Sequence, residues 1–373
     1  MSDFLPYCPP HVQKIPPYVA GRPISDVVRE FGLQRGDVVK LASNENPLGM
    51  PGKSRLAISA ALAEGNQYPD ANGFELKAAL SDHYAIDAGC ITLGNGSHDI
   101  LEMIARAVLQ PGQSALYSQY SFVVYSTATQ ACGAEYIVVP ADASMGHDLD
   151  AMAAAIRADT RLVYIANPNN PTGHFLSGEK VLAFIERVPS QVVVVLDEAY
   201  TEYLEPADRY DSLRWIDRFP NLLVTRTFSK AFGLAGLRVG FGVASPALTG
   251  LINRVRQVFN VNALAQVAAA AALGDAVFLA RSREVNRNGY AQLTNAFDAM
   301  KLSYVPSWGN FVMVRVGRDD GAGARVNAAL MKRGIIVRPL GSYDLPCWLR
   351  ITIGLPDENA RLIAALQALS LNG

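Results

Sequence analysis

Three short runs in the middle of the chain are apolar throughout. They cover residues 162–165, 192–196 and 222–224. Strands without polar interruptions are typical of parallel sheets that carry helices on both faces, and the segments between these runs have helical spacing. The pattern therefore predicts an α/β fold with a mainly parallel sheet.

A polar motif follows each of the three runs. In chain order the motifs are residues 167–173, 197–200 and 226–238. Open α/β sheets bind ligands at the carboxyl ends of their strands, so we expect the three motifs to meet at one site. The side chains that we expect there are Asn170, Asp197, Tyr200 and Lys230.

Lys230 lies just after the third run, where a buried strand ends. A desolvated lysine amine loses its proton easily and becomes a nucleophile for carbonyl groups. Thr227, Ser229 and Arg238 offer the hydroxyls and the planar cation that bind a phosphate. A carbonyl-reactive lysine beside a phosphate site suggests pyridoxal phosphate (PLP) as cofactor. Taken alone, this stretch fits a surface lysine in a glycine-rich loop equally well.

A second candidate phosphate site lies earlier, between a short strand at residues 91–93 and a helix that follows it. The turn contains Gly96, Ser97 and His98, and backbone N–H groups at the start of a helix attract anions. A dinucleotide fingerprint is a weaker interpretation, because its third glycine is missing. Ser97 as a simple N-cap is compatible with a phosphate site.

The chain divides by pattern into three parts. Prolines and a short amphipathic helix at residues 24–31 characterise an N-terminal arm, residues 1–40. Residues 41–275 carry the strands and motifs described above and form a large domain. From residue 276 onwards, a long helical pattern is followed by mixed strands and helices, which predicts a small α+β domain at residues 276–373.

Two arginines, Arg338 and Arg350, lie within apolar strands of this last part. A buried arginine needs an anionic partner. No acidic residue is an evident partner for either, which favours a substrate anion. A structural salt bridge is the alternative.

Composition limits the possible functions. The 373 residues carry a formal net charge of -1 and no long basic run, which argues against nucleic acid as a partner. The four cysteines are scattered, so we expect neither a metal site nor a disulfide framework, and free thiols fit a cytoplasmic protein. The N-terminus has no signal pattern, and the most apolar stretch, residues 263–273, is too short to span a membrane.

Six motifs occur in order along nearly the whole chain. They are Leu41–Gly49, Gly94–Ser97, Asn167–Gly173, Asp197–Tyr200, Thr227–Arg238 and Arg350–Gly354. Together they resemble the motifs of fold-type I PLP-dependent aminotransferases, and most of all those of the histidinol-phosphate aminotransferase family. The resemblance implies a mainly parallel seven-stranded sheet in the large domain and a homodimer. It also implies amino transfer from histidinol phosphate to 2-oxoglutarate in histidine biosynthesis.

The resemblance further implies roles for the residues around the cofactor ring. Lys230 would bond to the aldehyde carbon of PLP and move the Cα proton of the substrate. Asp197 would pair with the pyridine nitrogen and keep it protonated, while Asn170 and Tyr200 would hydrogen-bond the ring hydroxyl. Phe122 falls where the family stacks an aromatic ring on the cofactor, and a place in the core is the alternative for it.

The cofactor phosphate would be held by the turn after Gly96 and by groups near Lys230. These groups are the backbone amides of Ser97 and His98 and the side chains of Thr227, Ser229 and Arg238. Tyr68 would reach the phosphate in the neighbouring subunit, and it is the basis on which the homodimer is expected.

The predicted substrate site consists of Arg350, Arg338, Tyr18 and Asn44. Arg350 would bind the anionic group of the substrate with a bidentate fork, assisted by Arg338. Arginine suits both the phosphate of histidinol phosphate and a carboxylate of 2-oxoglutarate. Tyr18, on the arm, would close over the substrate.

Two loops depart from the family pattern. Residues 96–99 lack an acidic pair after the serine, and residues 118–122 lack a proline. Both features resemble a divergent branch, some members of which prefer aromatic amino acids. An aromatic amino-acid aminotransferase is therefore a close alternative, and a threonine-phosphate decarboxylase, which shares the fold, is a further one. A PLP-sensing transcription regulator would need a DNA-binding domain, for which the arm leaves no room.

Overall fold

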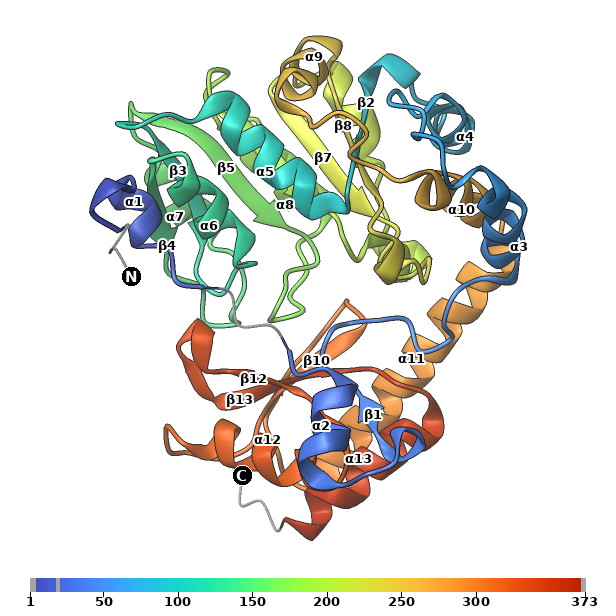
Figure 1. The fold of residues 1–373 in the computed structure, drawn as a ribbon. Coiled ribbons are helices and arrows are strands. Elements are labelled where there is room, and N and C mark those ends of the chain that lie inside the picture. The colour runs from blue at the N-terminus through green and yellow to red at the C-terminus, as the bar shows by residue number, and fades with distance from the viewer. Residues whose placement is uncertain (1–4, 18–20, 370–373) are drawn as a thin grey trace.

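A seven-stranded sheet forms the centre of the upper part of the molecule (Figure 1). The computed structural model describes residues 5–17 and 21–369. The sheet is mainly parallel, as the sequence predicts, because β8 alone runs against its neighbours in it. In spatial order the strands are β2 (Ile91–Gly94), β8 (Gly240–Ala244), β7 (Leu222–Thr227), β6 (Val193–Asp197), β5 (Thr160–Ala166), β3 (Ser114–Ser118) and β4 (Glu135–Val139).

Helices cover both faces of this sheet. One face carries α5 (Ser97–Val108), α6 (Val124–Ala131) and α9 (Pro246–Val255). The other carries α4 (Phe74–Tyr84), α7 (Leu149–Ala154), α8 (Gly178–Ile185) and α10 (Ala263–Leu273). A further helix, α3 (Gly52–Ala61), lies against α10.

The two-sided cover explains the unbroken apolar runs. Along β5, Leu162 and Tyr164 enter one core cluster, while Val163 and Ile165 enter the other. Burying each large apolar side chain is worth roughly 1.5–3 kcal/mol. A polar residue on either face would lose that contribution, so apolar and polar residues do not alternate along a central strand.

The lower part is built on a four-stranded antiparallel sheet. Its strands, in spatial order, are β12 (Arg338–Leu340), β13 (Leu345–Thr352), β10 (Phe311–Arg315) and β9 (Tyr304–Val305). Its core is closed by α11 (Ala276–Ala299), α12 (Ala322–Met331) and α13 (Pro356–Ala368). This is the α+β architecture expected for the end of the chain.

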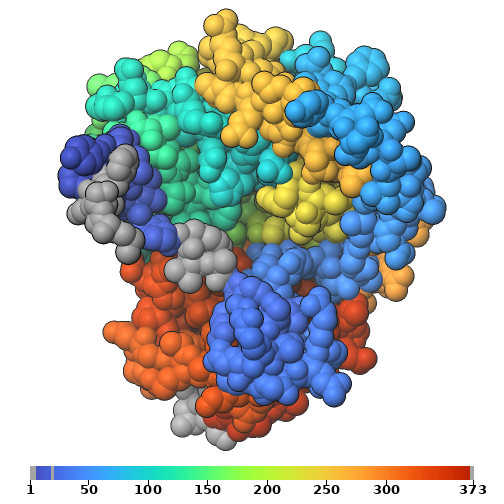
Figure 2. All heavy atoms as spheres, viewed as in Figure 1, coloured from blue at the N-terminus to red at the C-terminus, as the bar shows by residue number. Residues whose placement is uncertain are grey.

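The N-terminal segment contacts both parts. α1 (Pro10–Gln13) lies against α6, whereas α2 (Ile24–Phe31) forms at the residues expected and packs against the lower part. There β1 (Val39–Lys40) pairs in parallel with β11 (Ile335–Ile336). The strand expected at residues 335–338 is therefore divided between this pair and β12. Figure 2 shows the N-terminal segment, in blue, across the front of the lower part.

Short 3-10 helices complete the described structure. They are η1 (Leu5–Tyr7), η2 (Arg35–Asp37), η3 (Leu62–Glu64), η4 (Ala88–Cys90), η5 (Thr201–Tyr203), η6 (Pro206–Asp208), η7 (Ser212–Asp217), η8 (Ala235–Leu237) and η9 (Gly341–Tyr343). Across residues 5–17 and 21–369, no single helix has the length and apolar character to cross a membrane; α10 and α11 meet that test only as a pair bent by 82°.

Candidate active site

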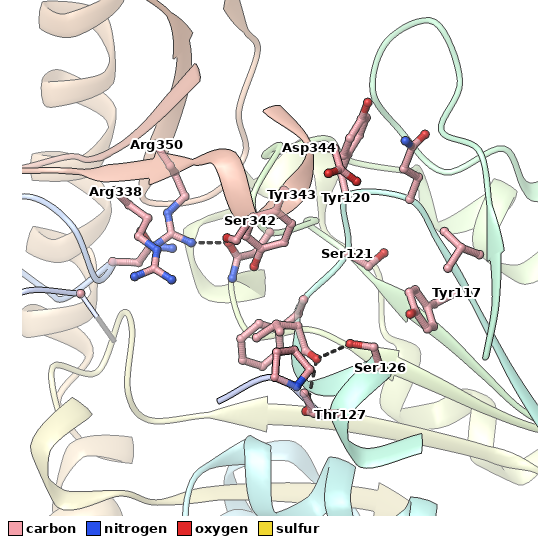
Figure 3. A pocket seen from close by; sticks show the side chains of 18 of the residues that line it. Tyr117, Tyr120, Ser121, Ser126, Thr127, Arg338, Ser342, Tyr343, Asp344 and Arg350 are labelled. Carbon is pink, nitrogen blue, oxygen red and sulfur yellow. Dashed lines mark hydrogen bonds between the residues drawn. The ribbon is translucent and has the colours of Figure 1, made fainter. Parts of the chain in front are cut away.

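Two adjoining cavities lie between the ends of the central strands and the lower sheet. The larger has a volume of about 750 Å³ and the smaller about 140 Å³. In Figure 3, Arg338 and Arg350 lie next to each other on one side of the larger cavity, and Tyr117 lies across from them. The residues that line both cavities are Phe122, Asn170, Tyr200 and Lys230.

The predicted residues meet here because of how the strands end. Asp197 is the last residue of β6, and Lys230 lies in the turn after β7. Asn170 lies in the loop that follows β5. These three strands are neighbours and run parallel, so their carboxyl ends share one edge of the sheet.

The Lys230 amine is partly buried and faces the aromatic ring of Tyr200. Its Nζ donates a hydrogen bond to the Ser43 carbonyl at 3.1 Å and lies 5.8 Å from the centroid of that ring. Burial lowers the pKa of Lys230 to about 7, and the nearby positive charge of Arg350 acts in the same direction. An amine with this pKa is partly neutral, and hence nucleophilic, near pH 7.

The Asp197 carboxylate is buried and held by two hydroxyls. Tyr125 Oη donates to its Oδ2 at 2.9 Å, and Thr225 Oγ1 donates to its Oδ1 at 3.2 Å. Burial raises the pKa of Asp197 to about 6, and the hydroxyls oppose that rise because they stabilise the charged form. At neutral pH the group is mostly ionised and fits a cationic ring nitrogen.

The Tyr200 phenol is buried beside the Lys230 amine. It accepts a hydrogen bond from Asn44 Nδ2 at 2.9 Å. Burial raises the pKa of Tyr200 to about 12, so the phenol keeps its proton and remains a donor at neutral pH.

Hydroxyls and a guanidinium gather at the far end of the smaller cavity. Thr227 Oγ1 donates to Ser229 Oγ at 3.0 Å, and Arg238 Nη1 donates to the same oxygen at 3.1 Å. Ser97 and His98, the first two residues of α5, line the cavity opposite them. In the structure Gly96, not Ser97, is the N-cap of that helix, with φ of 81°.

This end of the cavity exists because two glycines leave room for it. A Cβ atom at Gly96 would lie 2.4 Å from Arg238 Nη2, and one at Gly240 would lie 2.5 Å from the backbone nitrogen of Ser97. A helix start, hydroxyls and a guanidinium around such a hollow are the donors that a phosphate dianion requires. With the Lys230 amine and the Asp197 carboxylate in the same cavity, the residues present fit PLP.

Phe122 also lines the smaller cavity, but its ring belongs to an aromatic group as well. It meets Tyr125 edge to face at a centroid distance of 6.0 Å and His98 at 6.3 Å. The partly buried ring contributes to the core cluster of that face of the sheet. The sequence left the cofactor site and the core as alternatives for Phe122. In the structure its ring belongs to both the cavity wall and the core.

Arg338 and Arg350 lie directly opposite each other on β12 and β13. Arg350 donates to Asn170 Oδ1 at 2.5 Å and to the Ala42 carbonyl at 2.8 Å. Like charges at opposed positions of an antiparallel pair repel. Two guanidinium groups on the wall of the larger cavity, which Lys230 also lines, therefore provide a site for an anion.

Asn44 belongs to the wall of the larger cavity and is held from several sides. It is buried, and its backbone N–H donates to Thr352 Oγ1 at 2.9 Å. Its φ of 54° is in the left-handed region, which asparagine tolerates better than most residues.

Two predicted residues are not among those that the structure brings together. The Tyr68 side chain is 82% exposed, lines neither cavity, and stacks on Phe259 with ring centroids 4.6 Å apart. Tyr18 lies outside the described residues. The nearest described residues before and after it, Pro17 and Gly21, line the larger cavity.

Tyr125 and Thr225 hold the carboxylate of Asp197, and neither was assigned that role from the sequence. Nothing in the sequence distinguishes Tyr125 from a core residue, although a buried tyrosine usually needs a partner for its hydroxyl. Thr225 is a polar residue near the end of a buried strand, so its hydroxyl likewise needs a hydrogen-bond partner. The turn at residues 342–344, which lines the larger cavity, has no comparable signal in the sequence.

The fold and the site define a PLP-dependent aminotransferase of fold type I, and the family model for class I and II aminotransferases matches residues 36–366. Two relatives are 62% identical: histidinol-phosphate aminotransferase 2 of Ralstonia nicotianae, over 98% of this chain and 97% of the relative, and histidinol-phosphate aminotransferase 1 of Cupriavidus pinatubonensis, over 97% and 96%. The solved structure of histidinol-phosphate aminotransferase from Sinorhizobium meliloti in complex with pyridoxal-5'-phosphate is 29% identical, with a TM-score of 0.89 over 96% of this chain and 97% of that one. The chain belongs to the histidinol-phosphate aminotransferase family.

Proposed function

We propose that this protein uses PLP to transfer the amino group of histidinol phosphate to 2-oxoglutarate, a step of histidine biosynthesis. The observation that carries the proposal is the pair of opposed arginines in the same cavity as Lys230. The names of the relatives that are 62% identical over nearly the full chain support the choice of substrate.

Each residue of the site has a task in this reaction. PLP, when bound, supplies a conjugated ring that spreads the electron pair left at the substrate Cα. Lys230 Nζ accepts the Cα proton and gives it up again, for which a pKa of about 7 suits it. Asp197 holds a proton on the ring nitrogen, and the Tyr200 phenol and the Asn170 amide orient the ring. The donors near Arg238 and at the start of α5 anchor the phosphate.

The two arginines account for a site that serves two anions in turn. The donor carries a phosphate and no carboxylate, whereas the acceptor carries carboxylates. A guanidinium forms paired hydrogen bonds with either group. Arg350 is already oriented by its bonds to Asn170 and Ala42, so one side chain receives both substrates.

A single-turnover experiment tests this assignment. The PLP-loaded protein is mixed with one amine at a time, without a keto acid, and the visible absorbance of the bound cofactor is followed. We expect rapid loss of absorbance with histidinol phosphate and much slower loss with phenylalanine or tyrosine. Faster loss of absorbance with phenylalanine or tyrosine would mean that an aromatic amino acid, and not histidinol phosphate, is the amino donor. Release of carbon dioxide from threonine phosphate, with no loss for any amine, would mean a decarboxylase.

We also propose that the protein is a homodimer in which Tyr68 completes the partner's phosphate site. Its exposed ring lies among other exposed apolar side chains of the upper part, and groups of this kind often mark contacts between proteins. We call these side chains the apolar patch: Leu56, Leu62, Tyr68, Phe74, Val258 and Phe259.

A further inference from the structure

A phenol donates a hydrogen bond to the carboxylate of Asp197. Tyr125, in α6, has a fully buried side chain and donates its hydroxyl to Asp197 Oδ2 at 2.9 Å. Thr225, in β7, donates to the other oxygen at 3.2 Å. Both carboxylate oxygens thus have a donor from the protein, and the carboxylate lines the smaller cavity.

The position of the Tyr125 ring is fixed by its neighbours. It stacks on Tyr164, with ring centroids 4.4 Å apart and an angle of 9° between the planes. Phe122 packs almost at a right angle to it, with ring centroids 6.0 Å apart. A ring enclosed in this way cannot swing its hydroxyl away from Asp197.

We propose that Tyr125 is a positioning residue, whose phenol keeps Asp197 ionised and aimed at the ring nitrogen of PLP. This inference rests on the proposed function for the identity of the cofactor. A buried carboxylate tends to take up a proton, and each hydrogen bond to its charged form opposes that tendency. A protonated Asp197 would lose most of its attraction for a cationic ring nitrogen.

The other charged and titratable groups near Asp197 act in different directions. Burial raises the pKa of Asp197 most, the hydrogen bonds from Tyr125, Thr225 and the backbone of Ala199 lower it, and repulsion from Glu198 adds a smaller rise. Lys230, from the turn after β7, is attracted to the carboxylate when protonated, and Tyr200 follows β6 close by. Burial raises the pKa of Tyr125 well above its usual value, so the phenol remains a donor across the whole neutral range.

The stacked pair provides a matched control. Tyr164 is buried beside Tyr125, and the side chains that donate to Asp197 are those of Tyr125 and Thr225, not that of Tyr164. Tyr125→Phe and Tyr164→Phe each remove one buried phenol oxygen and keep the ring. Only the first removes a donor to Asp197.

The test measures the affinity of each protein for PLP and for a PLP analogue in which C–H replaces the ring nitrogen. We expect Tyr125→Phe to bind PLP about tenfold more weakly at neutral pH, since a hydrogen bond to a charged group is lost. Its affinity for the analogue should stay within about twofold of the unaltered protein. Tyr164→Phe should bind both ligands as the unaltered protein does. Thr225→Val offers a second route to the same selective loss if Tyr125→Phe folds poorly.

The outcomes separate this inference from the function on which it rests. Equal loss of both ligands in Tyr125→Phe, or no loss of PLP, would overturn the positioning role. If the unaltered protein binds PLP no better than the analogue, the pairing of Asp197 with the ring nitrogen fails, and the positioning role fails with it. If the unaltered protein distinguishes the two ligands and Tyr125→Phe does so equally well, only the positioning role is wrong.

Discussion

Burial acts in opposite directions on the two central titratable side chains. It lowers the pKa of Lys230 to about 7 and raises that of Asp197 to about 6, because a poorly solvated site disfavours the charged form of each. Near pH 7 the protein therefore presents a partly neutral amine and a mostly ionised carboxylate. Carbonyl capture and the binding of a cationic ring nitrogen need these two protonation states.

Covalent capture of PLP by the cofactor-free protein should accelerate as the pH rises through about 7. Below the lowered pKa of Lys230 the amine is protonated and unreactive, and above it the amine is a free nucleophile. The rate is read from the appearance of the visible absorbance of bound PLP. Arg350→Met removes a cation that helps to lower this pKa, so its midpoint should lie at higher pH. A midpoint near 10.5 in the unaltered protein, the ordinary value for lysine, would contradict the assignment.

Replacing Arg350 with alanine should raise KM for both histidinol phosphate and 2-oxoglutarate. Loss of charge-assisted hydrogen bonds to an anion corresponds to about a tenfold effect or more. Steady-state kinetics with each substrate varied in turn provide the measurement. Arg333→Ala, on the exposed surface after α12, is the control and should leave both constants unchanged. A rise for one substrate alone would mean that the two anions bind at different places.

The residues at the centre of the site could be inferred from the sequence because their types are costly where they stand. A lysine, an aspartate and two arginines at the ends or in the middle of buried strands call for partners. Tyr125 could not be assigned in this way, because a tyrosine near the start of a helix is equally at home in a core. Its bond to Asp197 depends on where the fold places α6 relative to the end of β6, which no local pattern encodes.

At the scale of elements, the sequence predicts which segments are buried better than it predicts how they run. The apolar runs correctly give β5, β6 and β7, since strands covered on both faces need no alternation. The reversed direction of β8 could not be inferred, because a buried strand has the same composition in either direction. The division of residues 335–340 between β11 and β12 depends on β1, almost 300 residues earlier by their printed positions.

The junction of β8 with α5 should not tolerate a methyl group. A Cβ atom at Gly240 would lie 2.5 Å, 2.8 Å and 2.9 Å from three backbone atoms, none of which can turn aside. We expect Gly240→Ala to lower the free energy of unfolding by about 1–3 kcal/mol. PLP affinity should also fall, because the Ser97 amide must move.

Gly250→Ala is the matched control for that change. Gly250 is exposed within α9, and a Cβ atom there would meet nothing within 4 Å. Alanine in the interior of a helix should stabilise the protein by about 0.5–1 kcal/mol. Denaturant unfolding of the PLP-free proteins, followed by PLP titration, distinguishes the two. Equal stability and equal PLP affinity for both variants would show that the backbone around Gly240 is not close-packed.

At the scale of the whole molecule, the site is assembled from segments that are distant along the chain. Asn44, Lys230 and Arg350 meet at the larger cavity. The N-terminal segment reaches the lower part through β1 and α2, so the wall of the cavity that contains Asn44 is fixed from there. Contacts between such distant segments cannot be inferred from a local sequence pattern. The motifs therefore predict which residues belong to the site, but not how the residues are arranged in it.

The proposed dimer supplies the last prediction. The apolar patch lies over α3, α4 and the segment between α9 and α10, on the side of the molecule opposite α1 (Figure 1). Val258 is 73% exposed, and Val258→Asp should shift the protein from dimer to monomer, because an unpaired carboxylate would be buried in the interface. If Tyr68 reaches the partner's phosphate site, the monomer should also bind PLP more weakly. Val12→Asp, on α1, introduces the same charge on the opposite side and should leave mass and affinity unchanged. Light scattering and PLP titration on the same samples provide the measurements. A Val258→Asp monomer that binds PLP normally would support the dimer interface but contradict the role of Tyr68 in the partner's phosphate site. An unaltered protein that is itself monomeric would contradict both the dimer and that role.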